Sequence, residues 1–474
     1  MTPRLRCLVI DDEPDLTSLV AEVLRHEGWQ VTEASSAEEA FKLLHEQTWS
    51  AVLCDIHLGG ADGFTVLHRF KAEMPAVPVV LMTAYASASG ALDAASFGAF
   101  DYILKPFDIE TLQAISQALK EQVLNYRPRR VRSPIAGTKY QPDIHLLGRS
   151  SAFIEVMKQV GRFAGTDLPV LLSGESGTGK EVVATSIHTR SPRRDYPFVA
   201  FNCGAISPEL IESELFGHMK GSFTGADRDR PGLWEAADKG TLFLDEITET
   251  TPTFQVKLLR VLQQGEVRRV GSNETQRVHV RVIAASNRDI EKEVAAGRFR
   301  QDLFYRLNSV SIHLPPLRDR PEDILLLAKS FAIQVYSLGT DIRFSEEALD
   351  LLQRYPWPGN VRELENAVVL STAVCDGTIR VKDLPERVRK YFADASSQVS
   401  RIPENLTTVK EELFPLTVVV ANYVGKVLAH TDGNKQAAAR LLQVDRKTLD
   451  RMMKRYNITS PNANGSAVAQ QAAD

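Results

Sequence analysis

The chain has 474 residues, of which 43% are hydrophobic and 24% are charged, and its formal net charge is −4. This length is too great for one hydrophobic core, so we expect two to four domains. The four cysteines lack metal-binding spacing, which argues against a disulfide framework or a zinc site. The N-terminus reaches acidic residues too early for a signal peptide, and no apolar run approaches the roughly 20 residues that cross a bilayer. We therefore expect a cytoplasmic protein without a membrane partner.

Two linkers and a tail are predicted from composition. Residues 126–143 are basic, rich in proline and without an apolar period, and residues 391–408 are mostly small and polar. Residues 460–474 have low complexity and are predicted to be disordered. The blocks that remain are 1–125, 144–390 and 409–459, so we expect a multidomain α/β protein.

In the first block, short apolar runs each end in polar residues. LRCLVI (5–10) is followed by Asp11 and Asp12, AVLC (51–54) by Asp55, VPVVLM (77–82) by Thr83, and FDYIL (100–104) by Lys105. Helical patterns at 13–27 and 37–47 lie between the runs, which predicts a doubly wound, flavodoxin-like parallel sheet. Ligands of such sheets bind beyond the carboxyl ends of the strands, where these polar residues should converge.

The acidic residues at this edge predict a site that accepts a phosphoryl group. The carboxylates of Asp11, Asp12 and Asp55 would repel one another without a cation, and oxygen ligands suit Mg²⁺. Asp55 could then attack a phosphoryl donor, while Thr83 and Lys105 could bind the new oxygens. The alternative for any one of these residues is a solvated loop position, but their ordered occurrence at successive strand ends argues against coincidence.

These residues resemble the response-regulator receiver family across 1–125. The resemblance implies that a partner sensor histidine kinase phosphorylates Asp55. It also implies that Thr83 and Tyr102 couple phosphorylation to a change of shape. Gly59 stands where many receivers have proline, a difference that removes no chemical group.

The second block opens with a phosphate-binding pattern. PVLLSGESGTGKE (169–181) reads as a strand, a glycine-rich turn and a helix, whose N–H groups and Lys180 could hold phosphates. The generic motif ends in Ser or Thr, whereas Glu181 stands here, so a simple glycine-rich turn remains an alternative. The predicted nucleotide-binding residues of this loop are Gly174, Glu175, Ser176, Gly177, Thr178, Gly179, Lys180 and Glu181.

Further strand ends supply the other parts of an ATPase. GTLFLDEI (240–247) places Asp245 to hold Mg²⁺ with ATP and Glu246 to orient or deprotonate water. RVIAASN (281–287) ends in Asn287, which could contact the γ-phosphate. Arg300 and Arg306 could act as fingers that complete a neighbouring subunit's site, and the alternative is a surface salt-bridge network.

This block looks like the AAA+ domain of bacterial enhancer-binding proteins from about 147 to 391, including a small helical subdomain. In that family the phosphate loop reads GESGTGKE, so Glu181 is the expected residue. The resemblance implies that Asn202 switches the catalytic glutamate and that Arg362 senses the nucleotide. It also implies homodimers that assemble into hexamers or heptamers.

ESELFGHMKGSFTGA (212–226) resembles that family's GAFTGA motif, with Ser222 in place of alanine. The resemblance implies that this loop touches sigma-54 RNA polymerase. The residues themselves also predict a mobile loop, because glycines recur and Phe223 lacks a core period. The predicted contact residues are Gly221, Ser222, Phe223, Thr224, Gly225 and Ala226.

The third block predicts an all-α helix-turn-helix. Helical apolar spacing over 409–430 is followed by GNKQAAARLL, a turn that contains Gln443 and Asp445, and KTLDRMMKRY. Between 429 and 456, seven Lys or Arg outweigh three Asp, a local net charge of +4. The alternative is a helical hairpin that dimerises. The block resembles the Fis-type helix-turn-helix, with Gln443 where glycine is usual, which implies binding to upstream enhancer-like DNA. The predicted DNA contacts are Lys435, Arg446, Lys447, Thr448, Arg451 and Lys454.

Taken with these resemblances, the sequence predicts a phosphorylation-controlled transcription activator that uses ATP and Mg²⁺ in a ring to act on sigma-54 RNA polymerase. A receiver-linked protein unfoldase and a receiver-linked repressor with a vestigial nucleotide site are the alternatives. The loop at 221–226 argues against both, and the intact pair Asp245 and Glu246 argues against the repressor.

Overall fold

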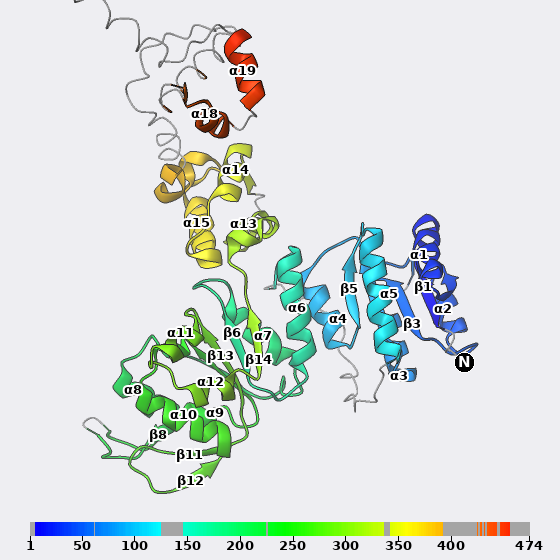
Figure 1. Cartoon of the computed structure of the whole chain (residues 1–474). Coiled ribbons are helices and arrows are strands. Elements are labelled where there is room, and N and C mark those ends of the chain that lie inside the picture. Colours follow the sequence, from blue (N-terminus) through cyan, green and yellow to red (C-terminus); the bar gives the residue numbers. More distant parts are fainter. Residues whose placement is uncertain are drawn as a thin grey trace, which may run out of the picture. The chain divides into compact units, whose positions relative to one another are not determined.

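The computed structural model of the chain describes residues 5–60, 62–124, 146–223, 226–335 and 342–391, together with parts of 424–455 (Figure 1). The chain divides into two units, residues 1–393 and 394–474. The predicted linker 126–143, nearly all of the linker 391–408, the stretch 409–423 and the tail 460–474 lie outside the described residues.

The N-terminal domain is a parallel sheet with the strand order β2-β1-β3-β4-β5. Its strands are β1 (Arg6–Ile10), β2 (Gln30–Ala34), β3 (Ala51–Asp55), β4 (Val79–Thr83) and β5 (Asp101–Leu104). Its helices are α1 (Pro14–His26), α2 (Ala37–Leu43), α3 (Gly63–Glu73), α4 (Ala88–Ser96) and α5 (Ile109–Leu124). The doubly wound fold and the four strands named from the sequence are confirmed, and β2 is an additional edge strand.

The central strands of this sheet explain why the sequence revealed them. Every residue of β3 and β4 is buried, because helices cover both faces of the sheet. Val52 belongs to the apolar core on one face and Leu53 to the core on the other. Strands buried on both faces are expected to be continuously apolar rather than alternating. The parallel register therefore brings their polar ends to one edge.

The central domain is a second parallel sheet, with the order β14-β6-β13-β10-β7. Its strands are β6 (Val170–Ser173), β7 (Phe198–Asn202), β10 (Thr241–Asp245), β13 (Arg281–Ser286) and β14 (Val310–His313). The helices around it are α6 (Ser151–Ala164), α7 (Lys180–Thr189), α8 (Pro208–Phe216), α9 (Leu233–Ala236), α10 (Pro252–Gln264), α11 (Ile290–Ala295) and α12 (Gln301–Leu307), with the short helix η1 (Ile247–Glu249). Small strand pairs are β8 (Gly217–His218) with β9 (Arg230–Pro231), and β11 (Glu266–Arg268) with β12 (Thr275–Arg277).

A helical lid follows the sheet and is the small subdomain that the sequence predicted. It contains η2 (Leu317–Asp319), α13 (Pro321–Val335), α14 (Glu346–Arg354), α15 (Asn360–Val374) and η3 (Val381–Asp383), with the strands β15 (Arg343–Phe344) and β16 (Thr378–Ile379). It has its own apolar core, in which Trp357 and Leu364 are fully buried.

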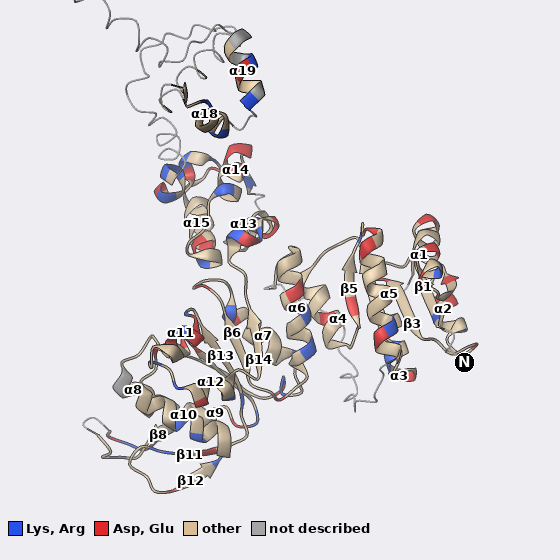
Figure 2. Cartoon of the chain, viewed as in Figure 1, with Lys and Arg blue, Asp and Glu red and all other residues tan. Residues whose placement is uncertain are grey.

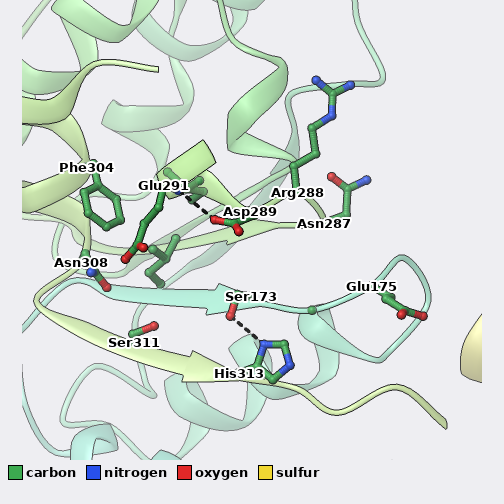
Figure 3. Close-up of a pocket in the computed structure, with 13 residues that line it drawn as sticks. Ser173, Glu175, Asn287, Arg288, Asp289, Glu291, Phe304, Asn308, Ser311 and His313 are labelled. Carbon is green, nitrogen blue, oxygen red and sulfur yellow. Dashed lines mark hydrogen bonds between the residues drawn. The ribbon is translucent and has the colours of Figure 1, made fainter. Parts of the chain in front are cut away.

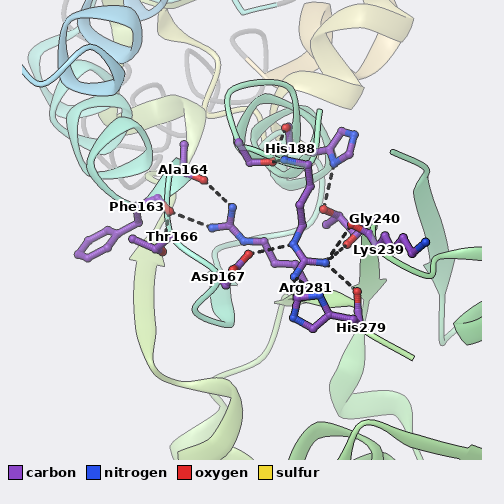
Figure 4. A network of polar contacts seen from close by, with 12 residues as sticks. Phe163, Ala164, Thr166, Asp167, His188, Lys239, Gly240, His279 and Arg281 are labelled. Atoms are coloured by element: carbon purple, nitrogen blue, oxygen red, sulfur yellow. Dashed lines mark hydrogen bonds and ion pairs between the residues drawn. The ribbon is translucent and has the colours of Figure 1, made fainter. Parts of the chain in front are cut away.

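Buried arginines bind the segments at the amino ends of the strands in this second sheet (Figure 4). Arg281 opens β13, is only 1% exposed, and donates hydrogen bonds to the carbonyls of Phe163 and Ala164 at the end of α6. Burial lowers the pKa of Arg281 to about 10. Arg193 binds the Asp167 carboxylate at 2.9 Å and also donates to nearby backbone carbonyls. These contacts fix α6 to the edge of the sheet opposite the phosphate loop.

The C-terminal unit contains two described helices, α18 (Lys435–Leu441) and α19 (Arg446–Arg455). Leu428, Ala438 and Leu449 belong to its small apolar core. Asn434 caps α18, since its side chain accepts hydrogen bonds from the N–H groups of the first turn. The turn at 443–445, with Gln443 and Asp445, lies outside the described residues.

Candidate functional site

The acidic residues of the receiver meet at the carboxyl edge of its sheet. Carboxylate oxygens of Asp11, Asp12 and Asp55 lie within 4.8 Å of one another. The Lys105 ammonium lies 2.7 Å from Asp55 Oδ2 and 2.8 Å from Asp11 Oδ2. Three carboxylates around one point form an oxygen donor set of the kind that Mg²⁺ uses. The predicted cluster is therefore present as a geometric group.

The charges in this cluster perturb one another. Burial raises the pKa of Asp11, against the opposing effect of Lys105. Burial also acts to lower the pKa of Lys105, but its hydrogen bonds and attraction to Asp11 and Asp55 outweigh burial, so its pKa is raised. Lys105 therefore carries its positive charge beside the carboxylate that would receive a phosphoryl group.

The two predicted switch residues, Thr83 and Tyr102, contact the same neighbour. The Thr83 hydroxyl accepts a hydrogen bond from the Tyr85 N–H at 3.1 Å, and the Tyr102 hydroxyl donates to the Tyr85 carbonyl at 3.3 Å. The Tyr85 side chain is 74% exposed. A change in what Thr83 binds would therefore act on Tyr102 through one short backbone segment.

Helix α4 and strand β5, which contains Tyr102, contact the central domain within the first unit. Lys158 of α6 lies 2.6 Å from the Asp101 carboxylate, and Arg190 lies 2.8 Å from Asp93. Gly161 permits close packing here, because a Cβ at that position would come 2.6 Å from the Ala95 Cβ. The predicted switch face of the receiver is thus joined to the ATPase by ion pairs.

The phosphate loop lies between β6 and α7. Gly174, Gly177 and Gly179 have φ values of 149°, 77° and 102°, a range that side chains disfavour, so glycine is required for this loop shape. Lys180 is buried, and its ammonium donates to the carbonyls of Gly174 and Glu175 at 2.8 Å each. The loop and its lysine have the arrangement expected of a phosphate-binding site.

The predicted catalytic acids lie beside this lysine. Asp245 ends β10 in register with Asn202 of β7. Burial lowers the pKa of Lys180, while the charges of Asp245 and Glu246 oppose that shift, which shows that the three groups interact. Asn202 accepts a hydrogen bond from the Gly204 N–H at 2.7 Å, and a Cβ on Gly204 would overlap Glu246 Oε2. The Asn202 segment therefore packs directly against the glutamate.

Two more predicted residues reach the phosphate loop. Asn287 lines a pocket of about 370 Å³ that also includes Gly174 and Glu175 (Figure 3). Arg362 of the lid donates to the Ser176 hydroxyl at 3.2 Å. The structure thus brings the sheet and the lid together around the loop.

The two candidate finger arginines contact residues outside the phosphate loop. Arg300 pairs with Asp302 at 2.7 Å, and Arg306 donates to the Leu262 carbonyl at 2.8 Å. Arg306 also lines a hollow with Asp167 and His279, which precede β6 and β13. Arg306 therefore lies at the amino edge of the sheet, whereas the phosphate loop lies at its carboxyl edge.

The predicted sigma-54 loop lies between β8 and β9. The Gly221 N–H donates to the Ala226 carbonyl at 2.9 Å, which closes the base of the loop. The Phe223 side chain is 39% exposed, and its ring centre lies 5.1 Å from that of His218. Thr224 and Gly225 lie outside the described residues.

The predicted DNA-binding helix α19 is rich in basic residues (Figure 2). Arg446 and Arg451 are exposed on it, and Thr448 is partly exposed. Lys435 of α18 pairs with Asp450 at 2.9 Å, so this predicted DNA contact has an internal partner. The side chains of Lys447 and Lys454 lie outside the described residues.

Family models match four successive parts of the chain. A response regulator receiver domain matches residues 7–117, a sigma-54 interaction domain 146–313, an AAA+ ATPase lid domain 318–400, and a Fis-family bacterial regulatory protein 421–456. Their order is the one that the motifs predicted.

Curated relatives match nearly the whole chain. The transcriptional regulatory protein ZraR of Salmonella typhimurium is 41% identical over 449 residues, which cover 94% of this chain and 98% of ZraR. The chain belongs to the NtrC-like enhancer-binding response regulators. The DNA-binding transcriptional regulator NtrC of Escherichia coli is 38% identical, with 94% of this chain and 97% of NtrC covered. The crystal structure of NtrX from Brucella abortus is 28% identical, covers 96% of this chain and 100% of its own, and has a TM-score of 0.48.

Membership in this family establishes the general activity. The protein is a phosphorylation-controlled activator of sigma-54-dependent transcription in two-component signalling, and its central domain is an ATPase. No helix in the described part of the chain has both the length and the apolar character needed to cross a bilayer.

Some residues of this enhancer-binding protein's nucleotide site were not predicted from sequence. Arg318 binds Glu175, Asn360 binds Glu175 and Ser176, and Arg320 binds the Thr178 carbonyl. All three come from the lid, more than 140 residues away along the chain. The motif spacing carries no signal for such distant contacts.

Proposed function

We propose that this activator works as a ring in which each ATP site is completed by a neighbouring copy, and that Asp55 phosphorylation controls the ring. The carrying observation is the position of Arg306 at the edge of the sheet opposite the phosphate loop. A copy that packs head to tail can present that edge to the next copy's nucleotide. Closure of such contacts gives the hexamer or heptamer that we propose, assembled from homodimers.

In the receiver, we assign the phosphoryl acceptor to Asp55. A sensor histidine kinase would supply the phosphoryl group, and Asp11, Asp12 and Asp55 would hold Mg²⁺, which would neutralise the charge of the carboxylates and the incoming phosphate. Lys105 would pair with the new phosphoryl oxygens. Thr83 and Tyr102 would pass the change to the face that contacts α6.

In the ATPase, the loop at 174–181 binds the phosphates through its N–H groups and Lys180. Asp245 would hold the Mg²⁺ that accompanies ATP, and Glu246 would orient and deprotonate the attacking water. Asn202 would switch Glu246 between active and inactive positions. Asn287 and Arg362 would sense the γ-phosphate from the sheet and from the lid.

The ring's contacts with its partners come from two further elements. We propose that the loop at 221–226, which carries Phe223 and Thr224, contacts sigma-54 RNA polymerase. The helix-turn-helix at 409–459 would bind upstream DNA through α19, with Arg446, Lys447, Thr448, Arg451 and Lys454 as contacts, together with Lys435. Residues 1–125 and 144–390 would be the receiver and the ATPase domain, and the protein would act in the cytoplasm.

The test is open-complex formation by sigma-54 RNA polymerase on a sigma-54 promoter, with ATP and with or without a small phosphoryl donor. We expect ATP-dependent opening that increases with the donor. Thr224→Ala and Phe223→Ala should abolish opening while ATP hydrolysis continues, because the loop makes the partner contact. Asp55→Ala should remove the response to the donor.

Tyr196→Ala is the matched control, since Tyr196 is also an exposed aromatic of the ATPase domain. It should leave opening unchanged. Opening that survives in both loop variants would reject the loop assignment. Opening in Asp55→Ala that still increases with the donor would reject Asp55 as the acceptor.

A further inference from the structure

The phosphate loop carries an acid, Glu175, whose carboxylate binds residues of the lid. Glu175 Oε1 lies 2.6 Å from Arg318 Nη2, and Glu175 Oε2 lies 2.9 Å from Arg318 Nη1. The Asn360 amide also donates to Glu175 Oε2 at 3.1 Å. A carboxylate would repel a phosphate, so these bonds give Glu175 a different task from that of its neighbours in the loop.

Its two partners lie at separate places in the lid. Arg318 belongs to η2, where the chain leaves β14 and enters the lid, and Asn360 is the first residue of α15. Asn360 is completely buried and has a φ of 53°, a conformation that asparagine tolerates better than most residues. Its amide oxygen accepts from the Leu317 N–H at 2.8 Å. Glu175 therefore joins the beginning of the lid to its central helix.

The same lid elements also bind the carbonyl side of the loop. The Ser176 carbonyl accepts from the Asn360 amide at 3.0 Å, and the Gly177 carbonyl accepts from the Val361 N–H at 2.9 Å. The Thr178 carbonyl accepts from Arg320 at 2.8 Å. With these carbonyls turned toward the lid, the loop is shaped so that its N–H groups can face phosphates.

The ion pair between Glu175 and Arg318 is better suited to orienting the two side chains than to stabilising the fold. Both side chains are nearly half exposed, so the pair contributes little to the folding free energy. Its two parallel hydrogen bonds, however, fix the angle between the guanidinium and the carboxylate. Arg362, two residues after Asn360 on α15, donates to the Ser176 hydroxyl at 3.2 Å, so it lies on the helix that Asn360 joins to Glu175.

We propose that Glu175 is a positioning residue: through Arg318 and Asn360 it sets the lid so that Arg362 can distinguish ATP from ADP. The inference rests on the proposed role of Arg362 as a nucleotide sensor. In this role the carboxylate of Glu175 binds the lid and does not bind the nucleotide. A loosened lid would leave the loop able to bind the phosphates common to both nucleotides but would weaken recognition of the γ-phosphate.

The experiment measures the affinities of the full chain for ADP and for a non-hydrolysable ATP analogue, by competition with a fluorescent nucleotide. For Glu175→Gln, we expect the preference for the ATP analogue over ADP to fall about five- to tenfold, the size of a modest coupling between sites. Affinity for ADP should stay within about twofold. Arg318→Met and Arg362→Gln should give the same loss, and Glu175→Gln combined with Arg362→Gln should lose no more than either alone.

Asp376→Asn is the matched control, because Asp376 pairs with Arg380 on the lid surface at 2.8 Å and is not among the groups that bind the loop. It should preserve the nucleotide preference. A parallel loss of both affinities, an unchanged preference, or additive losses in the double variant would overturn the inference. Lys180→Ala tests the underlying site separately: if that variant retains both affinities, the loop is not the nucleotide site and the proposed function itself fails.

Discussion

The receiver and the ATPase domain use the same kind of sheet edge but differ in how complete their sites are within one chain. In the receiver, Lys105 directly contacts both Asp11 and Asp55. The proposed phosphoryl acceptor, a neighbouring carboxylate and the Lys105 ammonium are therefore already together in one chain. In the ATPase, Lys180 and Glu246 lie at one edge of the sheet, while Arg306 lies at the other. The receiver site therefore has its residues within one copy, whereas the ATPase site, as we propose it, takes Arg306 from a second copy.

This difference assigns distinct roles to the two reactions. Phosphorylation at the proposed acceptor, Asp55, would report a signal regardless of how many copies have assembled. In the proposed ring, ATP hydrolysis would occur only where copies meet, so it would depend on assembly. The ion pairs from α6 and Arg190 to the receiver offer a physical link between the two.

The largest expected effect comes from the finger. Arg306→Ala should reduce ATP hydrolysis about 10³-fold, because a finger arginine stabilises the charge of the transition state. Nucleotide binding and Asp55 phosphorylation should persist, since both sites keep their own residues. Steady-state hydrolysis and phosphoryl-donor labelling measure the two reactions. Arg277→Ala, a similarly exposed arginine on β12, is the control that should hydrolyse ATP normally.

Glu246→Gln should lower hydrolysis about 10²-fold while ATP remains bound, because the water loses its general base. Mixing this variant with Arg306→Ala tests whether one copy can complete the ATPase site of another. A Glu246→Gln copy retains Arg306, which can complete the site of an Arg306→Ala neighbour whose own Glu246 is intact. The mixture should therefore recover measurable activity. No recovery at any mixing ratio would indicate that each copy completes its own site.

Dilution separates the two sites without any substitution. ATPase activity per molecule should fall about tenfold as the protein is diluted through its assembly range, while the rate of Asp55 labelling per molecule should stay constant. Both are measured on the full chain over the same concentration series. ATPase activity per molecule that is independent of concentration would show that the ATPase site does not need a second copy.

The smallest effect concerns the link between the domains. Lys158→Ala with Arg190→Ala removes the partners of Asp101 and Asp93. We expect the phosphoryl donor to change ATPase activity about threefold less than it does in the unaltered chain, a modest coupling energy. Arg194→Ala, which removes a nearby, partly exposed arginine paired with Asp195, is the control. An undiminished response would show that the signal takes another path.

Much of both sheets was predictable, because strands that are buried on two faces appear in the sequence as uninterrupted apolar runs. Strands β3 and β4 are uninterrupted apolar runs that end in Asp55 and Thr83, and the ends of parallel strands meet at one edge. Strand β2 is not such an apolar run, since only Ala34 among its residues is buried. Motif spacing likewise located Lys180 and Asp245.

Contacts between distant segments could not be predicted in this way. Glu175 was assigned to nucleotide binding with the rest of its loop, but its carboxylate bonds to Arg318 and Asn360, which lie 143 and 185 residues further along the chain. The position of Arg306 at the amino edge of the sheet also depends on how α12 packs. Such relations follow from tertiary packing and leave no periodic signal.

The separation of Glu246 and Arg306 on opposite edges has a genetic consequence. In the proposed ring, a copy without Arg306 would retain an intact site of its own but would leave its neighbour's site without a finger. In a cell that makes both forms, each defective copy would interrupt a ring built largely from normal ones. An Arg306→Ala allele should therefore be dominant over the wild type, and its dominance should strengthen with gene dosage.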